Sequence, residues 1–332
     1  MNPRLTVSIG MTAYNEAANI RPLLSALLLQ REDGYTLKEI LVISDGSTDA
    51  TAACARSVRD PRLHVSERHD RQGQQARQNE LLRTYQGDIL VLMEADTLPA
   101  NDRTIAELVR PFWERSSSNL GMVVGSTLLV PPRSFLEIIL LHEDELKQAM
   151  FAELEEGRDD SHVYACRGQA MKALSGTFAR QLSWPADVPE DAYAYFAARQ
   201  RSLRVLKQPA ATVYMKGVST LSDRVRQYAK FSSGRDVLKA CVPPDVVHAA
   251  YALPRRLIAK QVFRAVRRKP LWTLLGLFEM AWTRACVMLR HPSAEMLAVP
   301  AKSSKDLGIL ARSRWEPGST PGGESVSVGA EC

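Results

Sequence analysis

Short apolar runs alternate with amphipathic segments through the first third of the chain. Apolar and β-branched runs predict strands at Leu5–Met11, Glu39–Ile43, Leu63–Val65 and Ile89–Met93. Between them we expect helices at about Ala17–Gln30, from Asp49 to about Val58, and at Ala76–Tyr85. Asn15 is predicted to cap the first helix, and Thr48 or Asp49 the second. Such alternation of strand and helix is typical of a parallel, doubly wound sheet.

Longer elements follow Pro99. The pattern predicts a helix at Asp102–Trp113, a strand at Met122–Val130, a helix at Phe135–Glu156, a strand at Val163–Cys166 and a helix opened by Val188–Tyr193 that ends near Leu203. The long helix contains the cluster His142-Glu143-Asp144-Glu145, in which consecutive residues point in different directions. We therefore expect a solvated or groove-lining face there, not a metal site.

The last third of the chain is basic and amphipathic. From Pro254 to Arg290, nine Lys and Arg residues stand against one acid, Glu279. On a helical wheel one side carries Arg256, Lys260, Arg264, Arg267 and Arg268, and another carries Ile258, Val262, Ala265 and Val266. After Pro270 an apolar stripe comprises Leu271, Leu274, Leu275, Phe278, Trp282 and Leu289. Glu279 and Arg284 interrupt any membrane-spanning window, so this segment either lies in a membrane interface or packs on the rest of the chain.

Composition limits the possible domain organisation and binding partners. With 332 residues, 45% hydrophobic and 24% charged, the chain can form one large α/β domain with an appendage. Its net charge of +6 favours an anionic partner, such as a nucleotide, nucleic acid or an acidic membrane surface. The tail from about Ser313 has the composition of a disordered segment.

Two features bear on where the protein works. The five cysteines form no CxxC pair, which indicates neither a zinc site nor a disulfide framework and favours a reducing compartment. The run Thr6–Ile9 is too short for the apolar core of a secretory signal. We therefore expect a cytoplasmic protein, with possible peripheral attachment at the inner face of the membrane.

Acidic residues end the apolar run Ile89–Met93. Glu94-Ala95-Asp96 stands at the carboxyl end of this strand, which faces the ligand crevice in an open α/β sheet. A divalent cation that also binds phosphates is commonly held by one or two such carboxylates. The alternative is a solvated loop that follows a core strand.

Five motifs stand in a recognisable order. They are Thr12-Ala13-Tyr14-Asn15-Glu16, Ser44-Asp45-Gly46-Ser47-Thr48-Asp49, Glu94-Ala95-Asp96, Glu190-Asp191 and Gln227-Tyr228-Ala229-Lys230-Phe231. The set resembles the inverting family 2 glycosyltransferases, which adopt the nucleotide-diphospho-sugar transferase fold called GT-A. The resemblance covers about residues 5–235. It implies an α/β fold of GT-A type, a Rossmann-like mixed sheet flanked by helices, with a basic amphipathic helical extension at the carboxyl end.

The resemblance also implies roles for individual residues. Thr12, Tyr14, Glu16 and Asp45 would bind the base and ribose of a nucleotide-sugar donor, UDP-sugar being the first expectation. Asp96, with Glu94, would bind Mg²⁺ or Mn²⁺ at the donor diphosphate. Asp191, beside Glu190, would be the general base for the acceptor hydroxyl. Gln227 and Lys230 would lie near the diphosphate and the acceptor channel.

Several residues depart from the family pattern. Glu94 replaces the usual first Asp of the metal motif, and Ser44 stands where many members have a further Asp. Lys230-Phe231 replaces Arg-Trp, and lysine lacks the bidentate fork of arginine. Near Gly73 and Asn79, where the family often has Lys, the loop has Gln74 and Gln75. These changes argue against a processive polysaccharide synthase and favour single-addition transfer.

We therefore predict a metal-dependent, inverting glycosyltransferase with a catalytic domain at 1–235, a helical extension at 236–300 and a disordered tail at 301–332. The acceptor would be a glycan or a lipid-linked hydroxyl, with no nucleic-acid partner. The alternative is a catalytically silent nucleotide-sugar-binding scaffold in a membrane-associated glycan assembly. A nucleotidyltransferase would need a Gly-rich phosphate loop after the first strand, and a Rossmann dehydrogenase would need GxGxxG, which does not follow Gly10. The sequence leaves the oligomeric state open.

Overall fold

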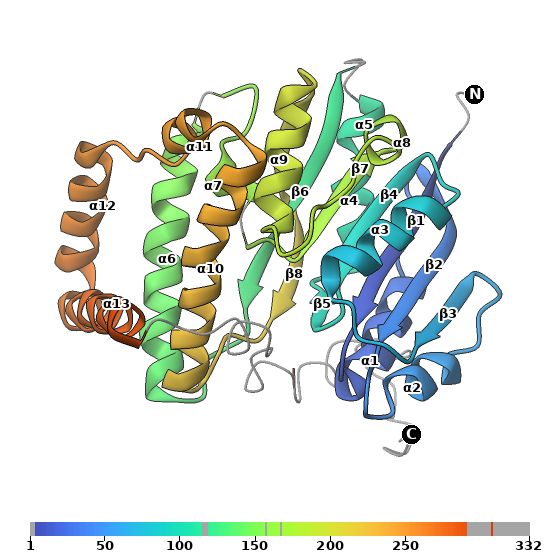
Figure 1. The fold of residues 1–332 in the computed structure, drawn as a ribbon, viewed down its shortest axis with the longest axis horizontal. Helices are drawn as coiled ribbons and strands as arrows, with labels where there is room; N and C mark the ends of the chain where they lie inside the picture. The colour runs from blue at the N-terminus through green and yellow to red at the C-terminus, as the bar shows by residue number, and fades with distance from the viewer. Residues whose placement is uncertain (1–3, 115–118, 157, 167, 291–306, 308–332) are drawn as a thin grey trace, which may run out of the picture.

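One eight-stranded sheet runs through the protein, with helices on both faces (Figure 1). The computed structural model describes residues 4–114, 119–156, 158–166, 168–290 and 307. The strand order in the sheet is β3-β2-β1-β4-β7-β6-β8-β5. This arrangement confirms the predicted mixed α/β sheet flanked by helices.

The first half of the sheet is parallel, as the sequence predicts. Its elements are β1 (Leu5–Ala13), α1 (Ala17–Leu28), β2 (Tyr35–Asp45), α2 (Thr51–Ser57), β3 (Leu63–Arg68), α3 (Gln74–Thr84) and β4 (Ile89–Glu94). β1 pairs in parallel with both β2 and β4, and β2 pairs in parallel with β3. The carboxyl ends of these strands therefore meet at one edge of the sheet.

The second half of the sheet reverses direction. Its elements are β5 (Thr97–Pro99), α4 (Thr104–Val109), α5 (Pro111–Glu114), β6 (Leu120–Leu129), α6 (Phe135–Glu155), α7 (Val163–Cys166), β7 (Met171–Ser175), α8 (Gly176–Ala179), α9 (Glu190–Gln200) and β8 (Arg204–Met215). β7 is antiparallel to its neighbours β4 and β6. The strand predicted at Val163–Cys166 is wrong, because this apolar run forms the short helix α7. β7 and β8 were not predicted.

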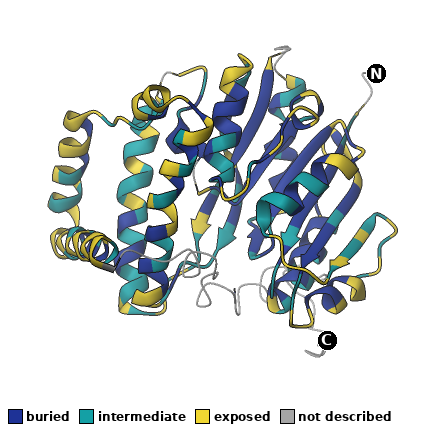
Figure 2. Ribbon diagram, viewed as in Figure 1, coloured by how far each residue is buried: buried dark blue, intermediate teal, exposed yellow. Residues whose placement is uncertain are grey.

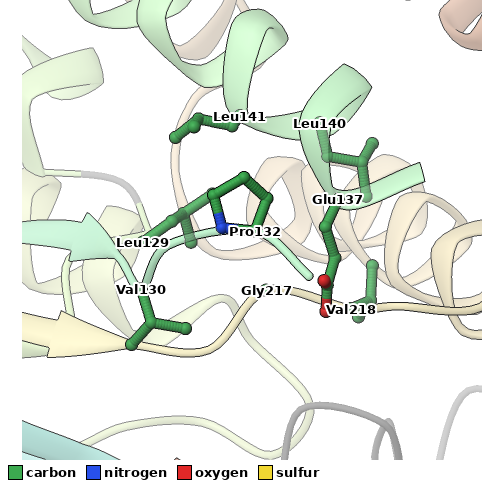
Figure 3. Close-up of a pocket in the computed structure, with 8 residues that line it drawn as sticks. All are labelled: Leu129, Val130, Pro132, Glu137, Leu140, Leu141, Gly217 and Val218. Atoms are coloured by element: carbon green, nitrogen blue, oxygen red, sulfur yellow. The ribbon is translucent and has the colours of Figure 1, made fainter. Parts of the chain in front are cut away.

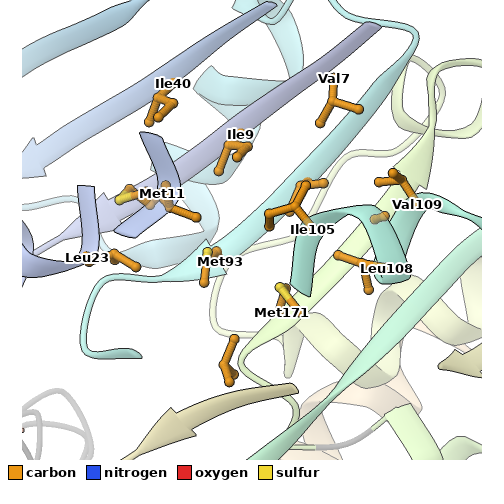
Figure 4. Close-up of a cluster of buried hydrophobic side chains, with 14 of the residues drawn as sticks. Val7, Ile9, Met11, Leu23, Ile40, Met93, Ile105, Leu108, Val109 and Met171 are labelled. Atoms are coloured by element: carbon orange, nitrogen blue, oxygen red, sulfur yellow. The ribbon is translucent and has the colours of Figure 1, made fainter. Parts of the chain in front are cut away.

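β4 is buried on both faces, as expected for the run that precedes Glu94. Ile89, Val91 and Met93 belong to the apolar cluster beneath α1 and α4, part of which is drawn in Figure 4. Leu90 and Leu92 point the other way, into the cluster formed with α3, α8 and α9. The alternation of side chains along a strand thus divides one apolar run between two cores. The central strands are buried along most of their length (Figure 2).

Four helices complete the described chain: α10 (Leu221–Cys241), α11 (Pro244–Ala250), α12 (Arg255–Arg268) and α13 (Pro270–Arg290). α12 and α13 confirm the two helices expected from the basic amphipathic pattern, and they lie against α6 at the far side from β1–β3 (Figure 1). No helix in the described residues has the length and apolarity to cross a bilayer. The tail predicted to be disordered lies outside the described residues except for Leu307, which is buried.

The predicted domain boundary at residue 235 falls inside α10. Leu238, Val242 and Val247, which follow that boundary, belong to the same apolar cluster as β4 and α9. We therefore propose that the catalytic part of the chain continues through α11 and that the extension begins with α12.

The acidic cluster of α6 differs from its prediction. Glu143 is buried, not solvated, and its Oε2 accepts hydrogen bonds from Arg224 of α10 at 2.5 Å and from Lys147 at 2.9 Å. Arg224 also reaches Glu279 of α13, with Nε 3.1 Å from Oε1. The buried Glu143 therefore links α6 to α10 and, through Arg224, to α13. A helical wheel of α6 by itself cannot reveal partners on other helices.

Candidate active site

Three strand ends form the floor of the site. Thr12 of β1 lies beside Ile43 of β2 and Glu94 of β4 in the sheet register. The loops after these strands carry the first three sequence motifs. The parallel pairing therefore brings together segments that are far apart along the chain.

The loops after β1 and β2 are fastened to each other. The Asn15 side chain accepts a hydrogen bond from the Thr48 N–H at 2.8 Å, and its backbone has a φ of 55°. The prediction that Asn15 caps α1 is therefore wrong, because its side chain binds the neighbouring loop. Asp49 instead accepts from the N–H groups of Ala17, at 3.2 Å, and Thr51, at 3.0 Å. One carboxylate thus serves the first turns of both α1 and α2.

Tyr14 and Glu16, both predicted donor-binding residues, are held in this loop pair. The Arg71 guanidinium carbon lies 4.0 Å from the centre of the Tyr14 ring, a cation–π contact. Glu16 is buried and its Oε2 accepts from the Asn19 side chain at 2.9 Å. Arg71 therefore lies on the ring face of Tyr14, where the sequence predicts a nucleotide base.

Asp45 is buried beneath the loop that precedes α3. Its carboxylate accepts from the N–H groups of Gln72, at 2.9 Å, and Gly73, at 2.8 Å, and from Arg77 Nε at 2.7 Å. Gly73 has a φ of 90°, a conformation that favours glycine at this turn into α3. Oδ1 takes two of these bonds and Oδ2 one, so Oδ2 keeps acceptor capacity for a further donor. The role of Asp45 in base recognition stays a prediction.

Three carboxyl groups, those of Glu94, Glu190 and Asp191, act on one lysine at the crevice, and Asp96 acts on Glu94. Glu94 is the last residue of β4 and Asp96 follows it, while Glu190 and Asp191 begin α9. Lys172, in the middle of β7, forms a short ion pair with Asp191, and its Nζ lies 3.9 Å from Glu190 Oε1. The Gly168 N–H donates to the other Asp191 oxygen at 3.1 Å. Lys172 was missed by the sequence analysis, although a charged residue inside an apolar run is a signal that could have drawn attention to it.

Burial and mutual repulsion shift the pKa values of these groups. Burial raises the pKa of Asp191 to about 6, although Lys172 opposes the shift. The pKa of Glu94 is raised well above its usual value by burial and then by Asp96, Glu190 and Asp191. The pKa of Lys172 is raised because the carboxylates outweigh the effect of its burial. The site therefore holds more carboxyl groups than its one lysine neutralises, and their negative charge is unfavourable without a further cation.

That surplus of negative charge suits a divalent cation. Within the described residues, no three His, Cys, Asp or Glu side chains are grouped to hold a metal by themselves. Mg²⁺ sites commonly use one or two carboxylates and take their other ligands from substrate phosphates and water. Glu94 and Asp96 fit that smaller share of ligands.

Side chains of α3 brace the segment before Glu190. Gln75 donates to the Val188 carbonyl at 2.8 Å, and Gln74 lies 3.4 Å from Glu190 Oε1. The Asn79 amide donates to the Trp184 carbonyl and accepts from the Trp184 N–H, each at 2.8 Å. These departures from the family pattern therefore position the acidic pair of α9.

Helix α10 approaches the same segment from the other side. A Cβ on Gly234 would meet Pro189 Cγ at 2.8 Å, so only glycine allows this close packing. Lys230 lies one turn earlier on the same helix face and is exposed. Gln227, in contrast, contacts Arg224, with Oε1 3.5 Å from its Nη1. α10 therefore packs Gly234 against the segment before the acidic pair and has Gln227 beside the buried Arg224, while the roles of Lys230 and Gln227 near the diphosphate stay predictions.

Two cavities lie near the ends of β6 and β8, apart from the acidic pair. The one in Figure 3 has about 20 Å³ and is lined by apolar side chains together with Glu137 of α6. The other has about 150 Å³ and includes Lys216 and Leu307. Neither includes the four carboxyl groups in its lining. The chemistry of the carboxylate cluster, and not the size of a cavity, identifies the candidate site.

Comparisons with known proteins agree with the fold. Residues 8–203 match the family model described as glycosyl transferase family 2. The structure resembles the mannosyltransferase PcManGT from Pyrobaculum calidifontis in complex with GDP-Man and Mn²⁺, with 20% identity, coverage of 88% of this chain and 89% of that chain, and a TM-score of 0.59. It also resembles residues 1–349 of TarS from S. aureus, with 18% identity, coverage of 80% and 74%, and a TM-score of 0.50. No curated protein sequence matches the chain.

Proposed function

Because the chain belongs to glycosyl transferase family 2, we propose that it moves a sugar from a nucleotide-diphosphate donor to a hydroxyl group, with inversion at the anomeric carbon. The observation that carries this proposal is the placement of Glu190 and Asp191 beside Lys172 and Glu94 at the end of the parallel strands. An acidic pair supported from two sides, next to a second acidic pair that fits a metal, provides both a base and a place for a diphosphate.

The donor binds across the loops after β1 and β2. Thr12, Tyr14, Glu16 and Asp45 surround its base and ribose. Because Arg71 covers the face of the Tyr14 ring in this structure, its guanidinium moves aside when the base binds there. UDP is the first nucleotide to test, since an aromatic face and a carboxylate acceptor suit a flat ring that carries an N–H group. A hexose is the expected sugar.

Asp96 and Glu94 hold Mg²⁺ or Mn²⁺ against the donor diphosphate. The bound cation would neutralise charge on the leaving nucleotide diphosphate. Lys230, on the α10 face that packs against Pro189, adds positive charge near the same group, and Gln227 helps to fix that helix through Arg224.

Asp191 acts as the general base. It takes the proton of the acceptor hydroxyl while that oxygen bonds to the anomeric carbon, and the bond from this carbon to the diphosphate oxygen breaks. Lys172 is a positioning residue, because its ammonium and the Gly168 N–H each hold one oxygen of Asp191. Glu190, braced by Gln74, completes the acidic pair.

The acceptor is a glycan or a lipid-linked hydroxyl in polysaccharide biosynthesis. The protein works on the cytoplasmic side, in peripheral contact with an anionic membrane. The net charge of +6 and the basic helices α12 and α13 support that setting.

Substitution Asp191→Asn tests the base. We expect it to abolish sugar transfer and donor hydrolysis while UDP still binds in the presence of Mn²⁺, measured by calorimetry. Asp187→Asn is the matched control: Asp187 is exposed, lies in the same segment and has a φ of 59°, which Asn also adopts. Full activity of the Asp191→Asn protein would refute the assignment of the base. If the unmodified protein binds UDP and shows no turnover, the silent scaffold is correct instead.

A further inference from the structure

Helix α13 exposes an apolar side to solvent and buries a polar side against the protein. Five of its apolar residues point away from the protein, with exposed fractions of 62% for Leu271, 58% for Leu274, 70% for Phe278, 39% for Trp282 and 82% for Leu289, whereas Trp272 packs on α6. Thr273, Glu279 and Thr283, on the opposite side, are buried against the protein. A helix that only packs on its own chain turns its apolar stripe inward. We call the five exposed residues the outer stripe.

Polar bonds fix this orientation. Glu279 accepts hydrogen bonds from Arg224 Nε at 3.1 Å and from the Thr283 hydroxyl at 2.6 Å. Arg224 is anchored in turn by Glu143 of α6. Rotation of α13 to hide the outer stripe would break these bonds and leave buried charges without partners. The described structure therefore holds the stripe outward.

The surroundings of the outer stripe are positively charged. Glu279 is the one acid between Pro254 and Arg290, and it is buried in the ion pair with Arg224. Arg267 and Arg268, just before α13, and Arg284, within it, are exposed. On this segment positive charge reaches the surface and negative charge does not. That arrangement complements an anionic lipid surface.

The size and composition of the stripe fit an interfacial helix. The 21 residues of α13 extend about 30 Å, and the stripe occupies one side along its length. Aromatic residues such as Trp282 favour the region between headgroups and acyl chains. Since α13 is not apolar enough to span a bilayer, its long axis would lie parallel to the membrane surface.

We propose that α13 lies flat in the headgroup region of an anionic bilayer, with the outer stripe immersed and Arg267 and Arg268, just before its first turn, on lipid phosphates. This inference specifies the membrane contact proposed above, but it does not depend on catalysis. It commits to lipid over a second copy of the chain, because two such basic faces repel each other.

Vesicle flotation of the full chain tests the proposal. The protein should float with phosphatidylcholine vesicles that contain phosphatidylglycerol, more weakly with phosphatidylcholine alone, and less as salt is added. The double variant Leu274→Ser, Phe278→Ser should lower the partition coefficient about ten-fold, since both exposed side chains lose apolar area. Arg267→Gln with Arg268→Gln should remove the preference for phosphatidylglycerol.

Leu29→Ser is the matched control, because Leu29 is an exposed leucine on the far side of the molecule at the end of α1. It should float like the unmodified chain. Equal flotation of the Leu274→Ser, Phe278→Ser protein overturns the proposal. So does a chain that stays in solution with every vesicle, or a lipid-free dimer that this double variant converts to monomer. The Asp191→Asn protein should float normally, so a failure of the base assignment leaves this result unaffected.

Discussion

At the scale of single residues, Lys172 has more effect on the site than its sequence context suggests. It is a buried ammonium beside the carboxyl groups of Glu94, Glu190 and Asp191, and it pairs with Asp191, the one we propose as the base. A buried carboxyl would ordinarily retain its proton near neutral pH, because low polarity disfavours its charged form. Lys172 opposes that tendency and keeps Asp191 available as a carboxylate.

The pH dependence of transfer should report this pairing. A general base works when deprotonated, so turnover should fall as pH drops through about 6, the raised pKa of Asp191. Lys172→Met removes the favourable charge, raises that pKa further and should move the acidic limb of the kcat/KM profile, which reports the free protein, to higher pH. Each unit of that displacement costs about ten-fold in rate on the limb.

Lys172→Arg is the control, since it retains a positive charge beside Asp191. It should keep most of the original acidic limb even if the larger group lowers the maximal rate. An acidic limb in the Lys172→Met protein that coincides with that of the unmodified protein would show that Lys172 does not act through Asp191.

Sequence motifs indicated the acidic residues, but not what surrounds them. Glu94 and Asp96 could be selected because they stand at the carboxyl end of an apolar strand, whereas Glu190 and Asp191 were selected through the resemblance to family 2 glycosyltransferases. Lys172 could not be assigned a partner, because its neighbour Asp191 is 19 residues away and the strand between β4 and β6 was unrecognised. The bonds that Asp45 accepts from the loop before α3 were likewise invisible, since they join residues 27 and 28 positions apart in the sequence.

At the scale of elements, α13 is attached by charge. Arg224 is 11% exposed and lies between Glu143 and Glu279, so three helices share one buried ion network. Removing the arginine leaves two carboxyl groups without their cation in a place that water hardly reaches.

We expect Arg224→Leu to lower the free energy of unfolding by about 3 to 5 kcal/mol, or to detach α13 locally, because breaking a buried pair costs that much. Denaturant unfolding gives the global value, and hydrogen exchange along α13 reveals local release. Lys239→Leu is the control on the same helix. Lys239 pairs with the exposed Asp236, so its loss should cost less than about 1 kcal/mol. Equal costs for the two variants would mean that the network adds no stability.

Prediction of elements succeeded where the apolar pattern was long or strictly periodic. β4, α1, α6 and α13 were all recognised in this way. The run Val163–Cys166 is only four residues long, and a run of that length has no period that separates strand from helix. β8 was overlooked because Pro209 interrupts it. The register jumps from the pair Val124–Lys207 to the pair Ser126–Thr212, so the proline sits in a bulge where its missing N–H is tolerated.

At the scale of the whole molecule, the reversal between β4 and β7 brings the two acidic pairs together. β7 runs antiparallel to β4, so Lys172 lies opposite Leu92, two residues before Glu94. Alternation of strand and helix predicted the parallel half of the sheet, because local order decides it. The antiparallel half depends on pairing between distant segments, which a single sequence does not reveal.

The polar underside of α13 also makes the carboxyl-terminal helices separable from the rest. If α13 were attached by apolar packing alone, its removal would expose an apolar, aggregation-prone surface. Here Glu143 and Arg224 can still pair with each other when α13 is absent. Consider a chain that ends at Leu253. Tyr251, close to this new end, would stay anchored because its carbonyl accepts a hydrogen bond from the Tyr164 hydroxyl at 3.0 Å. A protein shortened after Leu253 should therefore remain monodisperse in gel filtration and hydrolyse the donor, while it no longer floats with vesicles. Membrane binding and catalysis would then reside in separate parts of the chain, and evolution could remove or replace α12 and α13 without changing the catalytic residues.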